Sequence, residues 1–398
     1  MNLCVITFGP LRSKSNGYFV RVWNLVKEAS RFFDRVVVLE FPEEQTLHKQ
    51  AVKGTTFVQL RGNEADSGRF ASVLKKIFTF DPFQNLKFQL LSFIELWRYR
   101  EYVSTGDVVL IEGSLIPAGI VVAKLLGKKT ILDTHGMNKL LAKRFKGRKS
   151  LAYLSRILLW DVLERLTTRL SDLVIVVSGR EKDFVIEGYG IGRPRVFVVP
   201  NALESGKSVP NGAAVQALKA DLRIEGKIVI SFVGDLRIVH NFEAVEFITG
   251  KLAPAFWKTR KDVIFLIIGK GNERYGCDLP NVFFTGFVED LDLYMELSDI
   301  CVAPLAVGCG TKTKVIEYLV HGKPIVATPV GMEGLEALIH DYSGDLISIV
   351  PLDSFHEALQ RSISNLGRID EIKVEVNQVL IKDLRSNLKE VFCCANQV

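Results

Sequence analysis

Residues 303 to 328 read APLAVGCGTKTKVIEYLVHGKPIVAT. An apolar run leads into a loop with two glycines, a helical pattern follows and ends at Gly322, and a second apolar run begins two residues later. A strand, a helix and a further strand in this order predict a βαβ unit with parallel strands. We predict that Thr311 caps the helix, because a hydroxyl oxygen can accept from the free N–H groups of a first turn.

The loop and the start of this helix form a candidate anion site. Gly308 and Gly310 leave backbone N–H groups uncovered, and a helix N-terminus attracts negative charge. Lys312 and Lys314 would neutralise a diphosphate there. Glu317, one turn into the helix, would accept two hydrogen bonds from the vicinal hydroxyls of a ribose. The alternative for Lys314 and Glu317 is a surface ion pair at spacing i,i+3.

Short β-branched runs alternate with helical patterns on both sides of this stretch. In the second half the strand-like runs are 227–233, 263–268, 282–285, 300–303, 324–327 and 347–350. In the first half they are 3–8, 35–40, 108–112, 129–132, 173–177 and 195–199. This alternation predicts an α/β chain of two doubly wound, Rossmann-like domains. Parallel sheets bind ligands at the carboxyl ends of their strands, so we expect the two domains to face each other with those ends.

A linker-like segment, Asn201 to Gly226, separates the two series. We therefore predict an N-terminal domain over residues 1–202 and a C-terminal domain over residues 203–375. The pattern from Ile372 to Phe392 is helical with no strand after it. We expect this C-terminal helix, about 376–398, to pack back on the first domain.

Composition places the 398-residue chain among globular proteins, with 48% apolar residues, a mean hydropathy of +0.19 and a net charge of +6. The best candidate for a membrane span, Val108 to Leu126, contains Glu112, Pro117 and Lys124, which favours a buried strand and helix instead. The N-terminus lacks the pattern of a secretory signal. Six scattered cysteines predict reduced thiols in a cytoplasmic protein.

The net charge hides an asymmetry, because residues 1–200 carry +12 and residues 201–398 carry −6. Lys139 to Lys149 contains six basic residues and no acid, and Arg69 to Tyr102 interleaves aromatic with basic residues. This combination suits the headgroup region of an anionic membrane, and in principle also single-stranded nucleic acid. The alternative is a core-packed helix pair with a solvated face.

Further motifs along the chain are similar to those of a known family. They lie at residues 133–136, 198–201, 231–241, 265–271, 281–304 and 303–328. In this order they resemble the retaining glycosyltransferases of family 4, or group 1, which have the GT-B fold of two facing Rossmann-like domains. The resemblance covers most of the chain, strongest from Ser231 to Glu336 and weakest from Glu43 to Gly106. It implies that the N-terminal domain, residues 1–202, is the acceptor-side domain and that the C-terminal domain, residues 203–375, binds the nucleotide sugar.

The resemblance implies a metal-independent enzyme that moves a sugar from a nucleotide diphosphate sugar to a glycan or lipid-linked acceptor, with retention and no cofactor. Nucleic acid is not an expected partner. The implied catalytic residues are His135, near the transferred sugar, and Lys314, at the diphosphate. The implied donor-binding residues are Gly17, Asn201, Gly234, Arg237, Gly310, Thr311, Lys312, Lys314 and Glu317. From the residues alone, Gly17 and Asn201 can also be turn residues and His135 a structural histidine. With the charge asymmetry, we expect the enzyme on the inner face of a membrane.

Three positions depart from the family pattern. Cys309 stands where the family often has a first glutamate, eight residues before Glu317. Asp235 and His240 stand where many relatives have an arginine and a lysine. We therefore expect backbone N–H groups of residues 308–311 to contact the sugar.

Two other functions stay open. One is a nucleotide-sugar epimerase of the same fold, and the other is a degenerate, non-catalytic subunit that binds a membrane or partner. Asp290-Leu-Asp292 has the form of a metal motif but opens a helix, where acids are favourable in any case. Gly269-Lys-Gly271 lacks the third glycine of a dinucleotide site.

Overall fold

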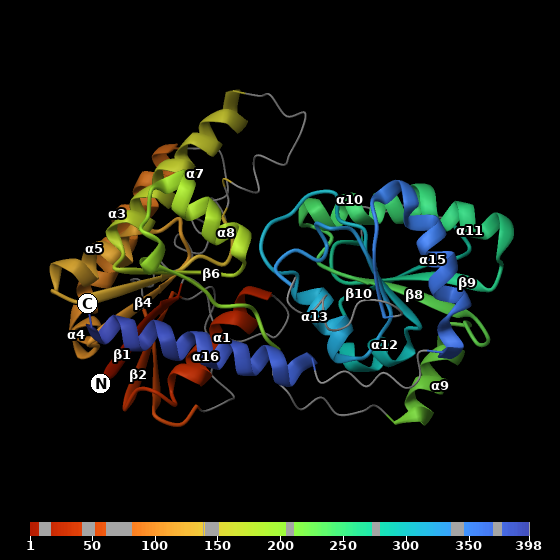
Figure 1. Cartoon of the computed structure of the whole chain (residues 1–398), viewed down its shortest axis with the longest axis horizontal. Helices are drawn as coiled ribbons and strands as arrows, with labels where there is room; N and C mark the ends of the chain where they lie inside the picture. Colours follow the sequence, from red (N-terminus) through yellow and green to blue (C-terminus); the bar gives the residue numbers. More distant parts are fainter. Residues whose placement is uncertain are drawn as a thin grey trace. The chain divides into compact units, whose positions relative to one another are not determined.

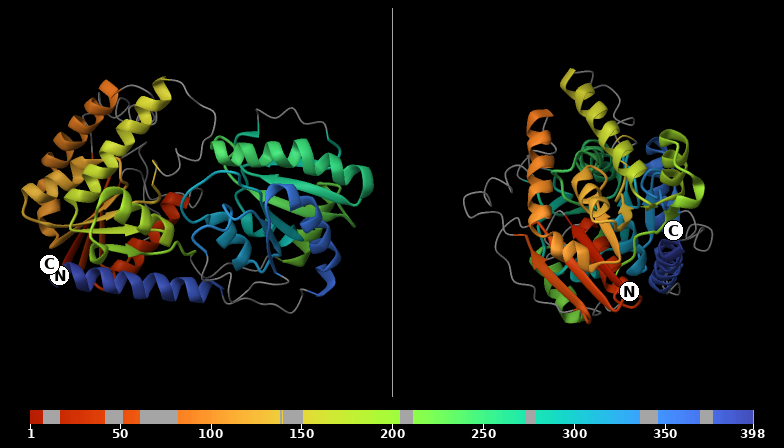
Figure 2. Two further views of the ribbon diagram at one scale, coloured as in Figure 1. Left: turned by 45° about the horizontal axis from the view of Figure 1, so that its top comes forward. Right: turned by 90° about the vertical axis from the view of Figure 1, so that its left-hand side faces the viewer.

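The computed structural model describes residues 1–7, 17–41, 52–60, 82–137, 139, 151–203, 211–272, 279–335, 346–368 and 376–397. The chain divides into two compact units, Met1–Ala202 with Ile381–Val398 and Leu203–Leu380. Each unit holds one parallel sheet with helices on both faces (Figures 1 and 2). Among the described residues, no helix has the length and apolar composition needed to cross a membrane.

The sheet of the first unit has the strand order β3-β2-β1-β4-β5-β6-β7. Its strands are Asn2–Thr7 (β1), Arg35–Glu40 (β2), Thr55–Gln59 (β3), Val108–Glu112 (β4), Lys129–Asp133 (β5), Leu173–Val176 (β6) and Val196–Val198 (β7). Its helices include Gly17–Ala29 (α1), Pro82–Arg98 (α3), Arg100–Thr105 (α4), Pro117–Leu125 (α5), Leu151–Leu170 (α7) and Gly179–Asp183 (α8). Figure 1 shows α3, α5, α7 and α8 on one face of the sheet and α1 on the other.

The sheet of the second unit has the order β10-β9-β8-β11-β12-β13. Its strands are Ile228–Val233 (β8), Val263–Ile268 (β9), Val282–Gly286 (β10), Ile300–Ala303 (β11), Ile325–Ala327 (β12) and Ile347–Ile349 (β13). Its helices include Gly212–Asp221 (α9), Val239–Phe247 (α10), Ala253–Thr259 (α11), Leu291–Leu297 (α12), Thr313–Val320 (α13) and Phe355–Ser364 (α15).

Every predicted strand is present, which confirms the alternation of strands and helices. The inner strands are covered on both faces, so they appear in the sequence as unbroken apolar runs, as in β9, which is buried throughout. The edge strand β3 was not predicted. Its residues Thr55–Gln59 mix polar and apolar types and stay partly exposed, so the run lacks that signal.

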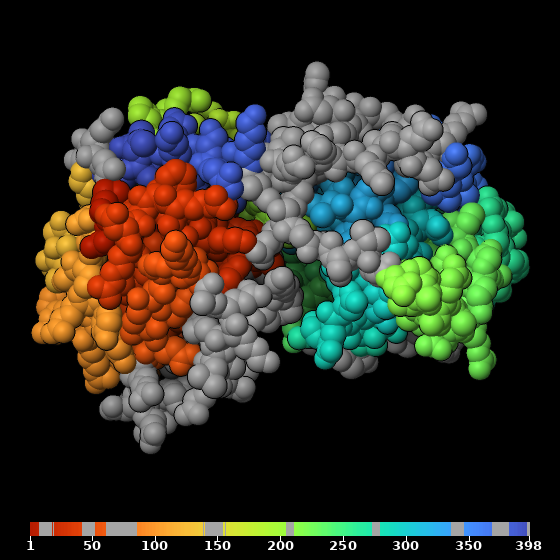
Figure 3. All heavy atoms as spheres, turned by 90° about the horizontal axis from the view of Figure 1, so that it is seen from below, coloured from red at the N-terminus to blue at the C-terminus, as the bar shows by residue number. Residues whose placement is uncertain are grey.

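The last helix, Val376–Gln397 (α16), returns to the first unit, as predicted (Figures 1 and 3). Arg385 of α16 donates from Nε and Nη2 to the carboxylate of Glu28 in α1, at 2.8 and 3.1 Å. The ring of Phe392 meets the edge of Phe33 with 4.8 Å between the centroids. An ion pair therefore holds α16 against α1, and an apolar contact holds it against the turn that follows α1.

In both sheets the strand order reverses beside the first strand of the unit, between β1 and β4 and between β8 and β11. In open parallel sheets, ligands bind outside the carboxyl ends of the strands at such a reversal. The loops after these strands, and after the adjacent β5, are therefore the places to look for function.

Candidate active site

In the second unit, two backbone segments approach each other closely after β8. Gly269 has a φ of +145°, and a Cβ atom on it would lie 1.9 Å from the carbonyl oxygen of Gly234. A Cβ atom on Gly234 would lie 2.9 Å from the Asn241 side chain and 3.0 Å from Lys314 Nζ. Glycine is required at both positions, because a side chain on Gly269 would collide with the Gly234 backbone and one on Gly234 would fill the space beside Lys314.

The amino group of Lys314 has no acidic partner among the described residues. Its Nζ donates to Asn241 Oδ1 at 2.5 Å and lies 4.1 Å from the ring centroid of Phe232. Within the described residues Lys314 forms no ion pair, so the alternative of a surface pair with Glu317 was wrong. Burial and the nearby charge of Lys312 lower the pKa of Lys314 well below its usual range. An anion bound beside Nζ would reverse that shift.

Lys312 lies in the loop that leads into α13. Its Nζ donates to the carbonyl oxygens of Cys309 at 2.8 Å and Gly310 at 2.6 Å, and the residue is only 6% exposed. Gly310 has a φ of +68°, a conformation that favours glycine. Lys312 thus fixes the glycine loop and places a second positive charge near Lys314.

The predicted helix cap was wrong. The helix begins at Thr313, so Lys312 and not Thr311 occupies the capping position, and the described side chains provide no cap. Thr311 faces Gly334 instead, where a Cβ atom would lie 2.5 Å from Thr311 Oγ1. The first N–H groups of α13 therefore lack a side-chain acceptor among the described residues, as expected of a helix that binds an anion.

Two further basic residues follow β8, Arg237 on the loop before α10 and His240 in the first turn of α10. Burial, with the charges of Lys314 and Lys312, lowers the pKa of His240 to about 3, so this imidazole is neutral at physiological pH. The guanidinium of Arg237 donates to Asp235 at 2.8 Å from Nε. Asp235 thus neutralises the exposed Arg237 and leaves the charge of Lys314 unpaired.

Glu317 lies one turn after Lys314 on α13 and is 9% exposed. Its carboxylate is 3.5 Å from Nε2 of His321, which is in turn 3.4 Å from the carboxylate of Asp292. Asp290 caps α12, where its Oδ1 accepts from the N–H of Leu293 at 3.1 Å. The structure therefore supports the helix-opening interpretation of the Asp290-Leu-Asp292 motif.

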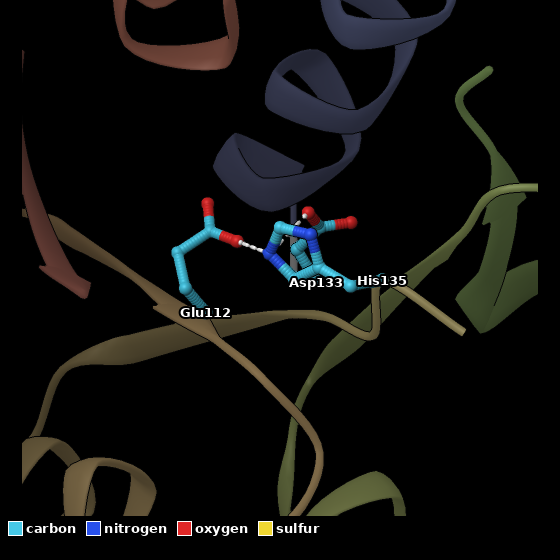
Figure 4. A group of neighbouring side chains, drawn as sticks. All are labelled: Glu112, Asp133 and His135. Atoms are coloured by element: carbon cyan, nitrogen blue, oxygen red, sulfur yellow. Dashed lines mark hydrogen bonds and ion pairs between the residues drawn. The ribbon is translucent and has the colours of Figure 1, made fainter. Parts of the chain in front are cut away.

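In the first unit, His135 follows β5 in the strained left-handed region, with a φ of +51°. Its Nε2 is 2.5 Å from Oε2 of Glu112 and 3.5 Å from Oδ2 of Asp133 (Figure 4). The ring of Tyr18 lies over the imidazole, with 4.3 Å between the centroids. Three side chains from α1, β4 and β5 thus hold the histidine in one orientation.

Burial determines the protonation of this cluster. Burial, and the neighbouring carboxylate of Asp133, raise the pKa of Glu112 well above its usual range. Burial, and the charge of Arg21, lower the pKa of His135 to about 4 despite the attraction of Asp133. The imidazole of His135 is therefore neutral near pH 7. The shift of Glu112 favours its protonated form, whose O–H can donate to His135 Nε2.

Arg21 of α1 connects the cluster to Asn201. Its Nε and Nη2 donate to the two oxygens of Asp133 at 2.7 and 2.5 Å, and its Nη1 donates to Asn201 Oδ1 at 2.8 Å. All three residues are buried. Gly17 is the first residue of α1, while its neighbour Asn16 lies outside the described residues. His135 and Asn201 thus belong to one hydrogen-bonded network of the first unit.

The state of His135 predicts a pH dependence of stability. The imidazole has a usual pKa of 6.5 and a folded pKa of about 4, so the unfolded chain binds more protons between these values. The free energy of unfolding should therefore fall as the pH decreases from about 6.5 to about 4, by at most about 1.4 kcal/mol per pH unit. Urea titrations over this pH range measure the slope, which should be present in the wild type, level off below about pH 4, and be smaller in His135→Gln. His356→Gln is the control, and an equal slope in His135→Gln would contradict the prediction.

Comparisons with known proteins agree with this geometry. The sequence model described as Glycosyltransferase Family 4 matches residues 15–205, and the one described as Glycosyl transferases group 1 matches residues 227–367. The chain belongs to the family 4, group 1 glycosyltransferases. An uncharacterized glycosyltransferase of Methanocaldococcus jannaschii, MJ1069, is 26% identical over 291 residues, which are 69% of each chain.

Solved structures confirm the GT-B fold of this glycosyltransferase. HepE of Anabaena, in complex with UDP-glucose, has a TM-score of 0.64 at 13% identity over the full length of both chains. WaaG, a glycosyltransferase involved in lipopolysaccharide biosynthesis, has a TM-score of 0.64 at 12% identity, and the match covers 99% of this chain and 98% of WaaG. The trehalose-6-phosphate synthase OtsA has a TM-score of 0.69 at 13% identity, and the match covers 100% of this chain and 99% of OtsA.

Sequence reasoning missed two residues that organise the glycosyltransferase's first unit. Glu112 counted only as a charge that argues against a membrane span, although a carboxylate at the carboxyl end of a buried parallel strand is itself a signal for a site. Arg21 lies between apolar residues of α1, where a buried charge requires a partner. In the second unit, sequence reasoning did not identify Asn241 as the hydrogen-bond partner of Lys314.

Proposed function

We propose that this glycosyltransferase moves a sugar from a nucleotide diphosphate sugar to a glycan or lipid-linked acceptor, with retention at the anomeric carbon and without a metal ion. The unpaired charge of Lys314 is the observation that carries the proposal. It lies beside the open backbone of Gly234 and the uncapped start of α13. Buried positive charge is costly unless an anion balances it, and a diphosphate has the matching charge. HepE, whose structure holds UDP-glucose, supports a nucleotide-sugar donor.

In the proposed reaction, the bond between the anomeric carbon and the diphosphate oxygen breaks, and the acceptor oxygen bonds to the same face of the sugar. The acceptor's proton passes to a phosphate oxygen of the departing diphosphate, so a side-chain base is not needed. Lys314 and the N–H groups of Gly310 and Thr311 stabilise charge that is greatest in the transition state. Lys312 adds its charge from the same loop.

The remaining predicted residues bind the donor in this proposal. The neutral His135 orients the transferred sugar, and Glu317 binds the ribose hydroxyls. The other proposed donor-binding residues are Gly17, Asn201, Gly234 and Arg237. The backbone of residues 308–311 replaces the sugar contact of the family's first glutamate, where Cys309 stands.

We also propose a cytoplasmic enzyme that meets its acceptor at the inner face of the membrane. The excess of basic residues in residues 1–200 supports attraction to an anionic lipid surface. The described cysteines, Cys4, Cys301, Cys309, Cys393 and Cys394, are free thiols, in keeping with a reducing compartment.

A panel of UDP-, GDP- and ADP-sugars tests the proposal. The chain should hydrolyse one class of donor slowly, transfer its sugar when a glycan or lipid-linked acceptor is present, and keep its activity in EDTA. Proton NMR of the product should show the anomeric configuration of the donor. Inversion, or loss of activity in EDTA, would contradict the mechanism. Conversion of the donor sugar without acceptor would favour an epimerase, and binding without turnover a non-catalytic subunit.

The proposed role of Glu317 predicts a change in donor affinity. Glu317→Gln should raise the donor KM by about tenfold and leave kcat nearly unchanged, because ribose contacts are equally strong in the ground and transition states. Initial rates over a range of donor concentrations measure both constants. Asp292→Asn, which removes a carboxylate beside the same His321, is the matched control. A lower kcat with an unchanged KM would contradict the role.

A further inference from the structure

Two helices of the first unit are apolar on the side that faces away from the core. On α3 the inward residues are Phe88, Ser92, Glu95 and Leu96, whereas the outward residues are Leu86, Leu90, Ile94 and Trp97, exposed by 39–60%. On α7 the outward residues are Leu154, Leu158, Val162, Leu166 and Leu170, one per turn and exposed by 39–65%. A water-facing helix surface is normally polar, so two such stripes indicate a binding surface.

The two stripes belong to one layer of the fold. The helix α5 packs against both α3 and α7, and it adds Leu125, which is 62% exposed. Figures 1 and 2 show the three helices together on the same face of the first sheet. We call the ten outward residues of these helices the outer apolar surface. They are Leu86, Leu90, Ile94 and Trp97 of α3, Leu125 of α5, and Leu154, Leu158, Val162, Leu166 and Leu170 of α7.

Basic side chains accompany this surface. Lys87 adjoins Leu86, Arg169 adjoins Leu170, and all four side chains are exposed. The guanidinium of Arg100 lies 5.6 Å from the ring centroid of Trp97, a combination that suits the boundary between headgroups and acyl chains.

We propose that the outer apolar surface docks on the face of an anionic lipid bilayer, with its leucines among the acyl chains and its basic residues at the headgroups. A second copy of the chain is the weaker candidate, because a two-fold interface would set Lys87, Arg100 and Arg169 against another surface of the same positive charge. Two separate helix ridges also need no complementary shape in a fluid bilayer. The outer apolar surface would be the part of the chain that makes the proposed membrane contact. Its role in reaching a membrane acceptor rests on the proposed function.

Vesicle sedimentation with the full chain tests the surface. The wild type should bind vesicles of phosphatidylcholine with a quarter phosphatidylglycerol at low salt, more weakly at high salt, and poorly without phosphatidylglycerol. Leu90→Asp/Leu158→Asp should lower the partition coefficient by at least about tenfold. The matched control is Phe287→Asp, which changes an apolar side chain of similar exposure, 53%, in the second unit and should leave binding unchanged.

Two further measurements separate the possible failures. Circular dichroism and donor hydrolysis without lipid should be the same for Leu90→Asp/Leu158→Asp and the wild type, so lost vesicle binding with both intact supports the surface. Equal binding by this variant and the wild type, or no binding by the wild type, would overturn it. A wild-type dimer that the variant converts to monomer, without vesicle binding, would assign the surface to self-association. Vesicle binding without any donor turnover would leave the surface standing and refute the proposed function.

Discussion

Lys314→Ala is expected to lower turnover of the sugar donor by about 10²- to 10³-fold. The Nζ group is the unpaired positive charge beside Gly234, and a departing diphosphate gains negative charge as its bond to the sugar breaks. A fixed cation therefore stabilises the transition state more than the bound donor, so the loss should fall on kcat rather than on KM. Steady-state rates with the best donor of the panel measure the effect.

Stability separates this role from a structural one. Burial lowers the pKa of Lys314, which means that its charge opposes folding at neutral pH. Lys314→Met, which keeps the volume and removes the charge, should therefore match or exceed the wild type in free energy of unfolding while its turnover is lost. Lys251→Ala changes an exposed lysine of the same unit and should leave turnover unchanged. Near-normal turnover in Lys314→Ala would contradict the proposed role.

Arg21→Ala is expected to lower the free energy of unfolding of the first unit by about 3–5 kcal/mol. The guanidinium binds both oxygens of Asp133, and the two side chains are 2% and 0% exposed. Removing it leaves a buried carboxylate without its cation and an amide oxygen of Asn201 without its donor. Urea titration followed by tryptophan fluorescence reports mainly on this unit, which holds Trp23, Trp97 and Trp160 of the four tryptophans.

Three further variants serve as comparisons for the Arg21→Ala measurement. Arg21→Lys keeps the charge and loses the two-pronged geometry, so it should fold and show a smaller loss. Arg21→Ala/Asp133→Asn removes both charges and should recover part of the loss. Arg98→Ala breaks a pair in which the arginine side chain is 52% exposed and that of Glu95 is 8% exposed, so water reaches the arginine and the loss should be smaller than that of Arg21→Ala. A loss in Arg21→Ala as small as that of Arg98→Ala would contradict a stabilising role for the network.

Local patterns predicted much of the fold. Buried parallel strands such as β8 and β9 are unbroken apolar runs, and the glycine loop before α13 lies between two of them. The edge strand β3 lacks this signal because one side of it meets solvent. The prediction of the cap of α13 was wrong because the stretch Thr311-Lys-Thr313 contains two hydroxyls that could each cap a helix. The backbone conformation, which the sequence pattern does not show, decides where the helix begins.

The contacts within each candidate site could not be predicted in this way. Lys314 and Asn241 are 73 residues apart, and Arg21 and Asp133 are 112 apart. Sequence patterns placed Lys314 and Asp133 in loops after strands, but the sheet order determines which loops meet. The apolar stripe of α7 was hidden for a related reason, because a helix apolar on both sides shows no clear periodicity.

The return of α16 to the first unit has a consequence for biosynthesis. Phe33, four residues after the end of α1, is 5% exposed, and α16 contributes the buried residues Leu384, Leu388, Val391 and Phe392. A ribosome makes this helix only after the whole second unit has been translated. The first unit therefore waits with an unfilled apolar face while the second unit folds, and it becomes complete only when α16 emerges. Nascent chains stalled before residue 376 should accordingly attract chaperones that bind apolar segments.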